Sequence, residues 1–157
     1  MPAKLVKEFL DSKNVKYVTI KHSKAYTAQE IAASAHIDGK HLAKTVILKV
    51  DGKLVFAVLP SSYKIDFNML QDALNTSNVR LATEQEFKDK CAGCEVGAMP
   101  PFGNLFNVET YVAASLVEDE DISFNSGTHT ELIRMSYRDF EKLVNPKILR
   151  FAAKYRV

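Results

Sequence analysis

Apolar positions along the chain recur with two spacings, one typical of helices and one typical of strands. Helical spacing and capping signals predict a first helix ending near residues 11–14, then helices at 27–35, 67–74, 87–90 and 137–144. Thr27 with Glu30, and Thr83 with Glu86, have the spacing of capping boxes, in which each side chain accepts from a free backbone amide. Asp66 precedes the helix at 67–74 as a capping residue.

Strand-like segments are short runs rich in β-branched and aromatic residues. They are predicted at 17–20, 44–50, 54–60, 79–81, 107–116, 122–124 and 130–135. Asp51-Gly52 is typical of a tight hairpin turn, and the apolar runs that it joins have both faces suited to burial, so we expect this hairpin at the centre of a sheet. The alternation in 130–135 is typical of an edge strand. Helices and strands are mixed, which predicts one α+β domain over residues 1–157 with a central mixed sheet.

Composition narrows the class of protein. The chain has 157 residues, of which 46% are hydrophobic and 25% charged, as in an ordinary soluble globule. The formal net charge is only +2, so a nucleic-acid partner would need a local patch rather than a polycationic surface. No apolar run approaches the roughly 20 residues that span a bilayer, and the N-terminus lacks the apolar core of a secretion signal. We therefore expect a cytoplasmic protein without a membrane partner.

The cysteines of the chain, Cys91 and Cys94, form a C-A-G-C motif. A structural zinc site normally needs four ligands, and no second cysteine pair exists. A redox motif of this kind is expected early in a thioredoxin-like unit, whereas this one lies beyond mid-chain. Ordinary buried or loop thiols are the favoured interpretation, and a redox or metal role is the weaker alternative.

Three separated segments could carry chemistry. Residues 97–103 (G-A-M-P-P-F-G) form a stiff loop, because proline fixes φ and lacks an N–H, while glycine lets a ligand approach the main chain. Lys44 stands at the start of a predicted strand, and Gly127-Thr128-His129 follows the end of another. Taken singly, each has an ordinary interpretation: a solvated lysine, a structural turn, and a polar turn with local hydrogen bonds.

The order of these segments resembles the YbaK/prolyl-tRNA-synthetase-associated editing-domain family. Further matches are H-S-K-A-Y-T-A-Q-E at 22–30, A-K-T-V at 43–46 and the first six residues of the proline loop. The resemblance extends from about His22 to the last predicted helix. It implies a mixed, partly barrel-like sheet flanked by helices, no metal or cofactor, and hydrolysis of the ester between a wrong amino acid and tRNA.

The resemblance also implies the site residues. Lys44 matches the family's functional lysine, Gly97 and Pro101 match its G-x-x-x-P loop, and His129 matches the histidine of the prolyl-synthetase branch, which favours clearance of alanine. We expect Lys44, Gly97 and His129 to act in catalysis. The expected substrate-binding residues are Tyr26, Thr45, Met99, Pro100, Pro101, Ser126 and Gly127. For His22, pocket-lining and packing roles stay equally open.

The chemistry of the ester agrees with this set of residues. An aminoacyl ester is already activated, so hydrolysis needs a placed water and a stabilised oxyanion more than a strong nucleophile. Backbone amides at Gly97 could hold the carbonyl oxygen of the ester. Lys44 could bind a phosphate, ribose or carbonyl oxygen, and His129 could orient the α-amine or the water. The sequence contains no Ser-His-Asp or Cys-His order, and Cys94 is the residue that would reopen covalent catalysis.

The sequence therefore predicts a trans-editing hydrolase that removes a small wrong amino acid such as Ala, Ser or Cys, with tRNA-Pro as the expected tRNA. A pocket walled by Met99, the prolines and the helix after Tyr26 would select by size. The expected partner is the 3′ end and acceptor stem of aminoacyl-tRNA, without DNA, and a synthetase partner is left open. The alternatives are a binding module for an aminoacyl or nucleotide ligand, or a synthetase-associated accessory protein.

Overall fold

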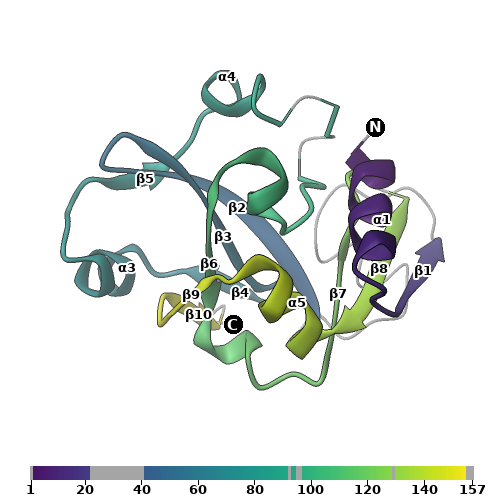
Figure 1. Ribbon diagram of the computed structural model, residues 1–157. Helices are drawn as coiled ribbons and strands as arrows, with labels where there is room; N and C mark the ends of the chain where they lie inside the picture. Colours follow the sequence, from purple (N-terminus) through teal and green to yellow (C-terminus); the bar gives the residue numbers. More distant parts are fainter. Residues whose placement is uncertain (1, 22–40, 92, 95–96, 129, 155–157) are drawn as a thin grey trace.

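A mixed β-sheet organises the protein in the computed structural model, which describes residues 2–21, 41–91, 93–94, 97–128 and 130–154 (Figure 1). Its strands are β1 (Tyr17–Lys21), β2 (Leu42–Val50), β3 (Lys53–Pro60), β5 (Val79–Leu81), β6 (Glu109–Ala113), β7 (Asp121–Asn125), β8 (Glu131–Ser136) and β9 (Lys147–Leu149). The strand order is β1-β8-β7-β2-β3-β6-β9, and β5 pairs with β2. A second, two-stranded sheet joins β4 (Tyr63–Ile65) to β10 (Ala152–Lys154). This mixed sheet with flanking helices agrees with the expected fold class.

Capping residues define where the described helices begin. The α-helices are α1 (Pro2–Ser12), α3 (Phe67–Leu74), α4 (Glu84–Phe87) and α5 (Tyr137–Val144), and two 3-10 turns follow the proline loop, η1 (Gly103–Phe106) and η2 (Ala114–Leu116). The Asp66 carboxylate accepts from the Met69 amide at 3.1 Å, and Thr83 with Glu86 forms the complete capping box. The predicted ranges of α3 and α5 are confirmed to the residue.

The β2–β3 hairpin lies at the centre of the sheet, as its apolar faces predicted. Its turn residues Asp51 and Gly52 have φ values of 49° and 82°, which suit the right-handed twist of the paired strands. β3 pairs with β6 on its other side. The opposite edge of β2 pairs at two separate places, with β7 at Leu42–Ala43 and with β5 at Leu48–Val50. Residues 44–47 lie between these two ladders.

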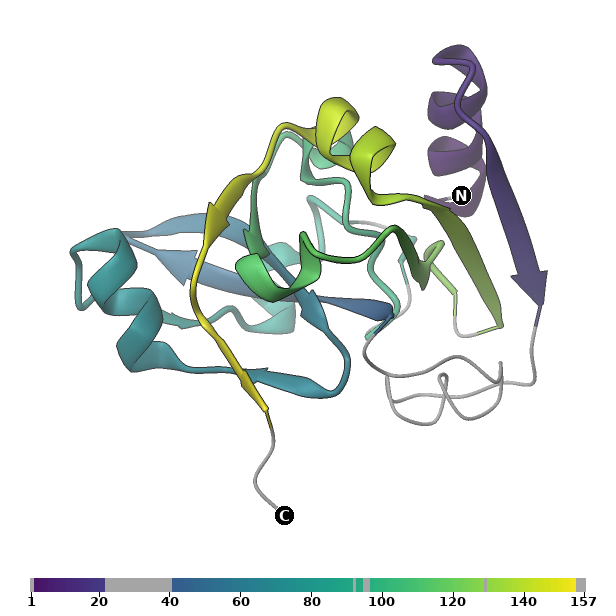
Figure 2. The same ribbon diagram turned by 90° about the horizontal axis from the view of Figure 1, so that it is seen from below.

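Apolar side chains pack against both faces of this sheet. Figure 2 shows the helices α1 and α5 on one side of β2 and β3. The Phe102 cluster, on the face covered by α1 and α5, includes Val6, Leu10, Val58, Phe102, Phe124 and Phe140. The Leu59 cluster, on the other face, includes Leu48, Leu59, Leu70, Tyr111 and Phe151. A third group, the Met99 cluster, joins Ile47, Phe56, Cys91, Met99 and Val108. Full burial of each large apolar side chain contributes about 1.5–3 kcal/mol.

Several predicted elements differ from those observed. β8 lies between β1 and β7, so the prediction of an edge strand at 130–135 was wrong, and β1 occupies that edge. The predicted helix at 87–90 was also wrong, because α4 ends at Phe87. The segment 107–116 is a strand only to Ala113 and then turns into η2. The helix predicted at 27–35 lies outside the described residues.

Candidate functional site

The start of β2 and the end of β7 bring two of the candidate segments together. The two strands pair in parallel with Ala43 opposite Phe124. The next residues in the same direction are Lys44 on β2 and Asn125 on β7, so these two lie side by side. Asn125 leads directly into Ser126 and the glycine turn. The lysine and the turn are therefore neighbours in space, although they are far apart in the sequence.

The Lys44 ammonium lies at the end of the hairpin. Its Nζ donates to the Ser61 carbonyl at 3.4 Å, and the side chain is half-buried. Ser61 is itself fixed, because its amide donates to the Leu42 carbonyl at 2.7 Å and it is 1% exposed. The structure thus anchors the cation by a long hydrogen bond to a main-chain oxygen, a contact that a substrate oxygen could replace.

Lys44 and Thr45 point to opposite faces of the sheet, because successive side chains alternate along a strand. Lys44 is in register with Leu59, and Thr45 with Val58. Val58 belongs to the Phe102 cluster, whereas Leu59 defines the cluster of the other face. Thr45 therefore shares its face with the end of the proline loop, and Lys44 begins on the other face, at the point where β7 leaves β2.

A glycine stands at each end of the proline loop, and the structure requires glycine at the two positions for different reasons. Gly97 is exposed and has a φ of 83°, a conformation that other residues adopt at a cost. Gly103 has no room for a side chain, since a Cβ there would lie 2.3 Å from Thr110 Oγ1 and 2.4 Å from the Val108 carbonyl oxygen. The Gly103 amide donates to Thr110 Oγ1 at 3.1 Å. The loop is thereby tied to β6.

Between these glycines, the side chains of the loop face the protein interior. Pro100 and Pro101 are buried, and Met99 is 6% exposed within the Met99 cluster. The Phe102 ring lies 5.3 Å from that of Phe124, centroid to centroid, which links the loop to β7. The loop is therefore packed rigidly against β2, β3 and β7 by its side chains. Contact of Met99 and the two prolines with a substrate stays a prediction.

The turn after β7 contains the local hydrogen bonds that its composition predicted. The Ser126 amide and hydroxyl both donate to the Glu131 carbonyl, at 3.3 and 3.4 Å. Gly127 has a φ of 124°, which favours glycine. The Ser126 hydroxyl proton is thus already used within the turn, and the residue is fully buried, so contact of Ser126 with a substrate stays a prediction. Tyr26, His129 and His22 lie outside the described residues.

The cysteines have the character of buried thiols. Both are free, and burial raises the pKa of Cys91 to about 11 and that of Cys94 to about 12. They are therefore protonated at neutral pH, and the thiolate is the form that attacks esters or binds metal. In the described part of the chain, no three His, Cys, Asp or Glu side chains are grouped as metal ligands. The raised pKa values favour the ordinary interpretation of C-A-G-C.

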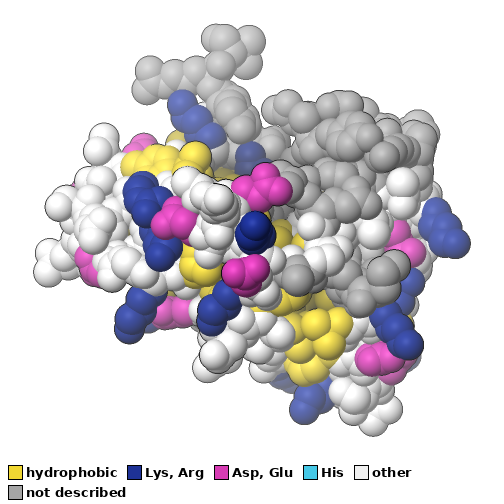
Figure 3. All heavy atoms as spheres, turned by 90° about the horizontal axis from the view of Figure 1, so that it is seen from above, with side chains coloured by type: hydrophobic (Ala, Val, Ile, Leu, Met, Phe, Trp, Pro, Cys, Tyr) yellow, Lys and Arg dark blue, Asp and Glu magenta, His cyan; other side chains and the backbone are white. Residues whose placement is uncertain are grey.

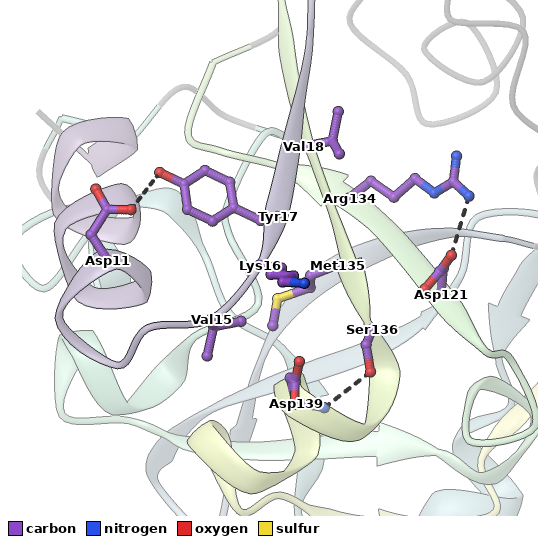
Figure 4. A pocket seen from close by; sticks show the side chains of 10 residues that line it. All are labelled: Asp11, Val15, Lys16, Tyr17, Val18, Asp121, Arg134, Met135, Ser136 and Asp139. Carbon is purple, nitrogen blue, oxygen red and sulfur yellow. Dashed lines mark hydrogen bonds and ion pairs between the residues drawn. The ribbon is translucent and has the colours of Figure 1, made fainter.

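A wide surface hollow lies at the other end of β7, where none of the candidate residues lines it (Figure 4). It has a volume of about 1040 Å³ and lies beside the start of β1 and of α5. Two pairs of its polar side chains bond each other: Tyr17 donates to Asp11 at 3.0 Å, and Arg134 donates to Asp121 at 3.1 Å. The polar groups in these pairs do not converge on a common point, so this hollow is not our candidate site.

Comparison with known proteins identifies the family. A family model described as the aminoacyl-tRNA editing domain matches residues 22–143. The chain belongs to the aminoacyl-tRNA editing domain family. The expectation drawn from the resemblance is confirmed, and the protein is an aminoacyl-tRNA deacylase, an enzyme that hydrolyses the ester linking an amino acid to tRNA.

Two curated relatives and one solved structure illustrate the match. The prolyl-tRNA editing protein ProX of Acetoanaerobium sticklandii is 26% identical over 141 residues, which is 86% of this chain and 85% of that protein. A proline–tRNA ligase of Bacillus cereus is 27% identical over 104 residues, covering 64% of this chain and 18% of the ligase. The crystal structure of a proposed trans-editing enzyme for prolyl tRNA synthetase has a TM-score of 0.80 at 18% identity, covering 99% of this chain and 98% of that one, and supports the editing-domain fold.

Two residues near Lys44 were not singled out by the sequence analysis. Ser61 contributes only a carbonyl oxygen, which any residue could supply, so no sequence signal marks it. Asn125 belongs to the segment F-N-S-G at a strand end, where the sequence indicates only that it helps to form a turn. The parallel register of β2 and β7 places it beside Lys44, and that register depends on contacts between distant segments. Among the described residues, no helix is long and apolar enough to cross a membrane.

Proposed function

We propose that this editing domain acts in trans on mischarged tRNA-Pro and removes a small wrong amino acid, with alanine favoured over serine and cysteine. The observation that supports it best is that Lys44 and the turn after β7 come together at the β2–β7 junction, and both segments lie within the residues that the family model matches. A relative that matches 86% of this chain is a prolyl-tRNA editing protein, and proline–tRNA ligases contain a related segment.

In the proposed reaction, water attacks the ester carbonyl, the acyl C–O bond breaks, and the products are the free amino acid and tRNA with its hydroxyl restored. Charge develops on the carbonyl oxygen, and donors placed before the reaction stabilise it best. We assign this role to backbone amides at Gly97, whose loop is fixed by Pro100 and Pro101. Because proline lacks an N–H, the prolines restrict which amides can point at the substrate.

Lys44 is proposed to hold a substrate oxygen near the scissile ester. Its present contact with the Ser61 carbonyl is long, at 3.4 Å, and a charge-assisted hydrogen bond to a phosphate or developing oxyanion is stronger. His129 is proposed to orient the α-amine or the attacking water in its neutral form. Tyr26, Thr45, Met99, Ser126 and Gly127 are the proposed contacts that shape the pocket.

Recognition of the tRNA is proposed to involve the 3′ end and the acceptor stem. Basic and acidic side chains are interspersed on the face shown in Figure 3, and the net charge is +2. Few phosphate contacts imply modest affinity that falls with salt. A size-selecting pocket excludes large side chains but discriminates weakly against small ones, since a methylene contributes about 1–3 kcal/mol. Discrimination between tRNAs is therefore assigned to the acceptor stem or to a synthetase partner, and DNA is not a proposed ligand.

A deacylation panel tests the proposal. tRNA-Pro charged with Ala, Ser, Cys, Thr or Pro is incubated with the wild type, with Lys44→Ala and with Lys49→Ala. Lys49 is the matched control, because it lies on the same strand and bonds the Gly52 carbonyl at 3.2 Å near the hairpin turn.

We expect turnover of the alanyl ester, a loss of about 10²-fold in kcat/KM for Lys44→Ala and little change for Lys49→Ala. Absence of turnover on every substrate, with retained binding of a non-hydrolysable aminoacyl adenosine, would support the binding-module alternative. Equal activity of the wild type and Lys44→Ala would remove Lys44 from the site and leave the enzyme assignment in place.

A further inference from the structure

We propose that Asn125 is a substrate-binding residue of this site, whose side-chain oxygen accepts a hydrogen bond from the reacting end of the aminoacyl ester. The inference rests on the proposed function and adds a residue to the same site. The argument has three parts: the position of Asn125 beside Lys44, the face to which it points, and the unused acceptor that it carries.

The position and the face follow from strand register. Ala43 lies opposite Phe124, and both belong to the Phe102 cluster, so their side chains point to that face. The next residues, Lys44 and Asn125, therefore point together to the other face. Lys44 and Asn125 are thus the first residues beyond the β2–β7 ladder, on the same face of neighbouring strands, at the place where the two strands part.

The acceptor on Asn125 is buried and unused. Asn125 is 5% exposed, and its Oδ1 has no hydrogen-bond partner within the described part of the structure. The residue opposite Asn125 on β8 is Leu132, whose side chain is apolar and fully buried. Lys44 Nζ donates to the Ser61 carbonyl. A buried carbonyl oxygen without a donor is unfavourable, and nearly all such groups in folded proteins have a partner. A donor brought by the substrate would satisfy it.

The reacting end of an aminoacyl ester has two suitable donors. One is the α-ammonium of the amino acid, and the other is the ribose hydroxyl next to the ester oxygen. Both would place the acyl group between Asn125 and Lys44. Because the oxygen is fixed in a β-strand with rigid neighbours, it would orient the ester at little entropic cost.

The test compares two replacements of Asn125 that differ in the acceptor. Asn125→Leu has a similar shape without polar atoms, and Asn125→Asp keeps an oxygen in the same place. We expect Asn125→Leu to raise KM for the alanyl ester about tenfold, the effect of losing one hydrogen bond to the substrate. Its melting temperature should stay equal or rise, because an unused buried acceptor has been removed. Asn125→Asp should keep KM within about threefold.

The control is Thr19→Leu, the same kind of change at an exposed position on β1, which should alter neither KM nor stability. A wild-type KM for Asn125→Leu would overturn the proposal. So would a fall in melting temperature and activity together in both variants, because that pattern indicates a structural role for the amide.

Binding of non-hydrolysable ligands separates this inference from the proposed function. The probe is 3′-alanylamino-3′-deoxyadenosine, together with analogues that lack either the α-amine or the 2′-hydroxyl. We expect Asn125→Leu to bind the complete probe about tenfold more weakly than the wild type. This difference should vanish for whichever analogue lacks the group, α-amine or 2′-hydroxyl, that donates to Asn125. A difference that persists with both analogues would overturn the proposal. Failure of the wild type in the deacylation panel would instead count against the proposed function alone.

Discussion

Gly103 and Thr110 are in such close contact that position 103 accommodates only glycine. The Gly103 amide donates to Thr110 Oγ1 at 3.1 Å, and a Cβ on residue 103 would lie 2.3 Å from the same oxygen. This contact connects the end of the proline loop to β6, which lies between β3 and β9 in the sheet. The position of the loop is therefore fixed by the main chain at one end.

Gly103→Ala should destabilise the protein by about 1–3 kcal/mol, because the added methyl group overlaps Thr110 and the Val108 carbonyl. Gly52→Ala is the matched control: it has open space and is strained only by its φ of 82°, so about 1 kcal/mol is expected. Urea denaturation gives both values. If both variants lose about 1 kcal/mol of unfolding free energy, the steric overlap at Gly103 does not have the effect predicted here.

Phe102→Ala should cost about 3–5 kcal/mol, because the ring fills the space between Phe9, Phe124 and Phe140. The same change should lower deacylase activity at temperatures where the variant is still folded, since Phe102 holds the loop against β7. Circular dichroism and the deacylation assay are the measurements. Phe87→Ala, at a half-buried position on α4, is the comparison, and an equal loss of activity there would argue against a specific role for Phe102.

Stability should fall as the pH decreases below about 4, in part through Glu86. Hydrogen bonds from the Arg80 guanidinium, at 2.7 and 2.8 Å, hold the pKa of Glu86 well below its usual range. The unfolded chain therefore takes up the proton first, so this contribution is present above the ordinary carboxyl pKa and is lost as the pH falls toward the folded value.

Glu86→Gln should flatten the decline in stability between about pH 5 and 3, measured by urea denaturation at each pH. Glu84→Gln, at an exposed neighbouring position, serves as the control. A decline as steep in Glu86→Gln as in the wild type would contradict the prediction.

Replacing the cysteines should leave catalysis intact. Burial raises the pKa of Cys91 to about 11 and that of Cys94 to about 12, so neither is a thiolate at neutral pH. The double variant Cys91→Ala, Cys94→Ser should keep kcat within about twofold, and thiol reagents should label the native protein slowly at pH 8. Loss of activity in this folded double variant would revive the covalent or redox alternative.

Local signals in the sequence identified the elements whose ends depend on single residues. Asp66 starts α3, and Asp51-Gly52 forms the central hairpin, because caps and tight turns depend on a few adjacent residues. By contrast, β4, β9 and β10 are three-residue strands, too short to show a hydrophobic period. The alternation of polar and apolar residues in β8 suggested an edge strand. In the structure β8 lies inside the sheet, because β1 pairs with it on the side opposite β7.

The candidate site was predictable as a set of segments but not as a geometry. Motif matches singled out Lys44, the proline loop and the glycine turn. They could not show that Thr45 faces the loop while Lys44 faces Leu59, since a one-residue shift in register exchanges the two faces. Asn125 was missed for the same reason: its proximity to Lys44 results from strand pairing across more than half of the chain.

The separation of β7 from β5 along one edge of β2 has a consequence for how selectivity can change. Beside residues 44–47 that edge lies between two ladders, while β3 pairs along the opposite edge from Ala43 to Val50. Under the proposed function, the room for a substrate beside Lys44 would be set by where β7 leaves β2, which is a property of the backbone. On that proposal, single substitutions of Thr45 or Met99 would change the available room by one or two methyl groups, whereas a change in the length of the turn after β7 would be needed to accept a different class of amino acid.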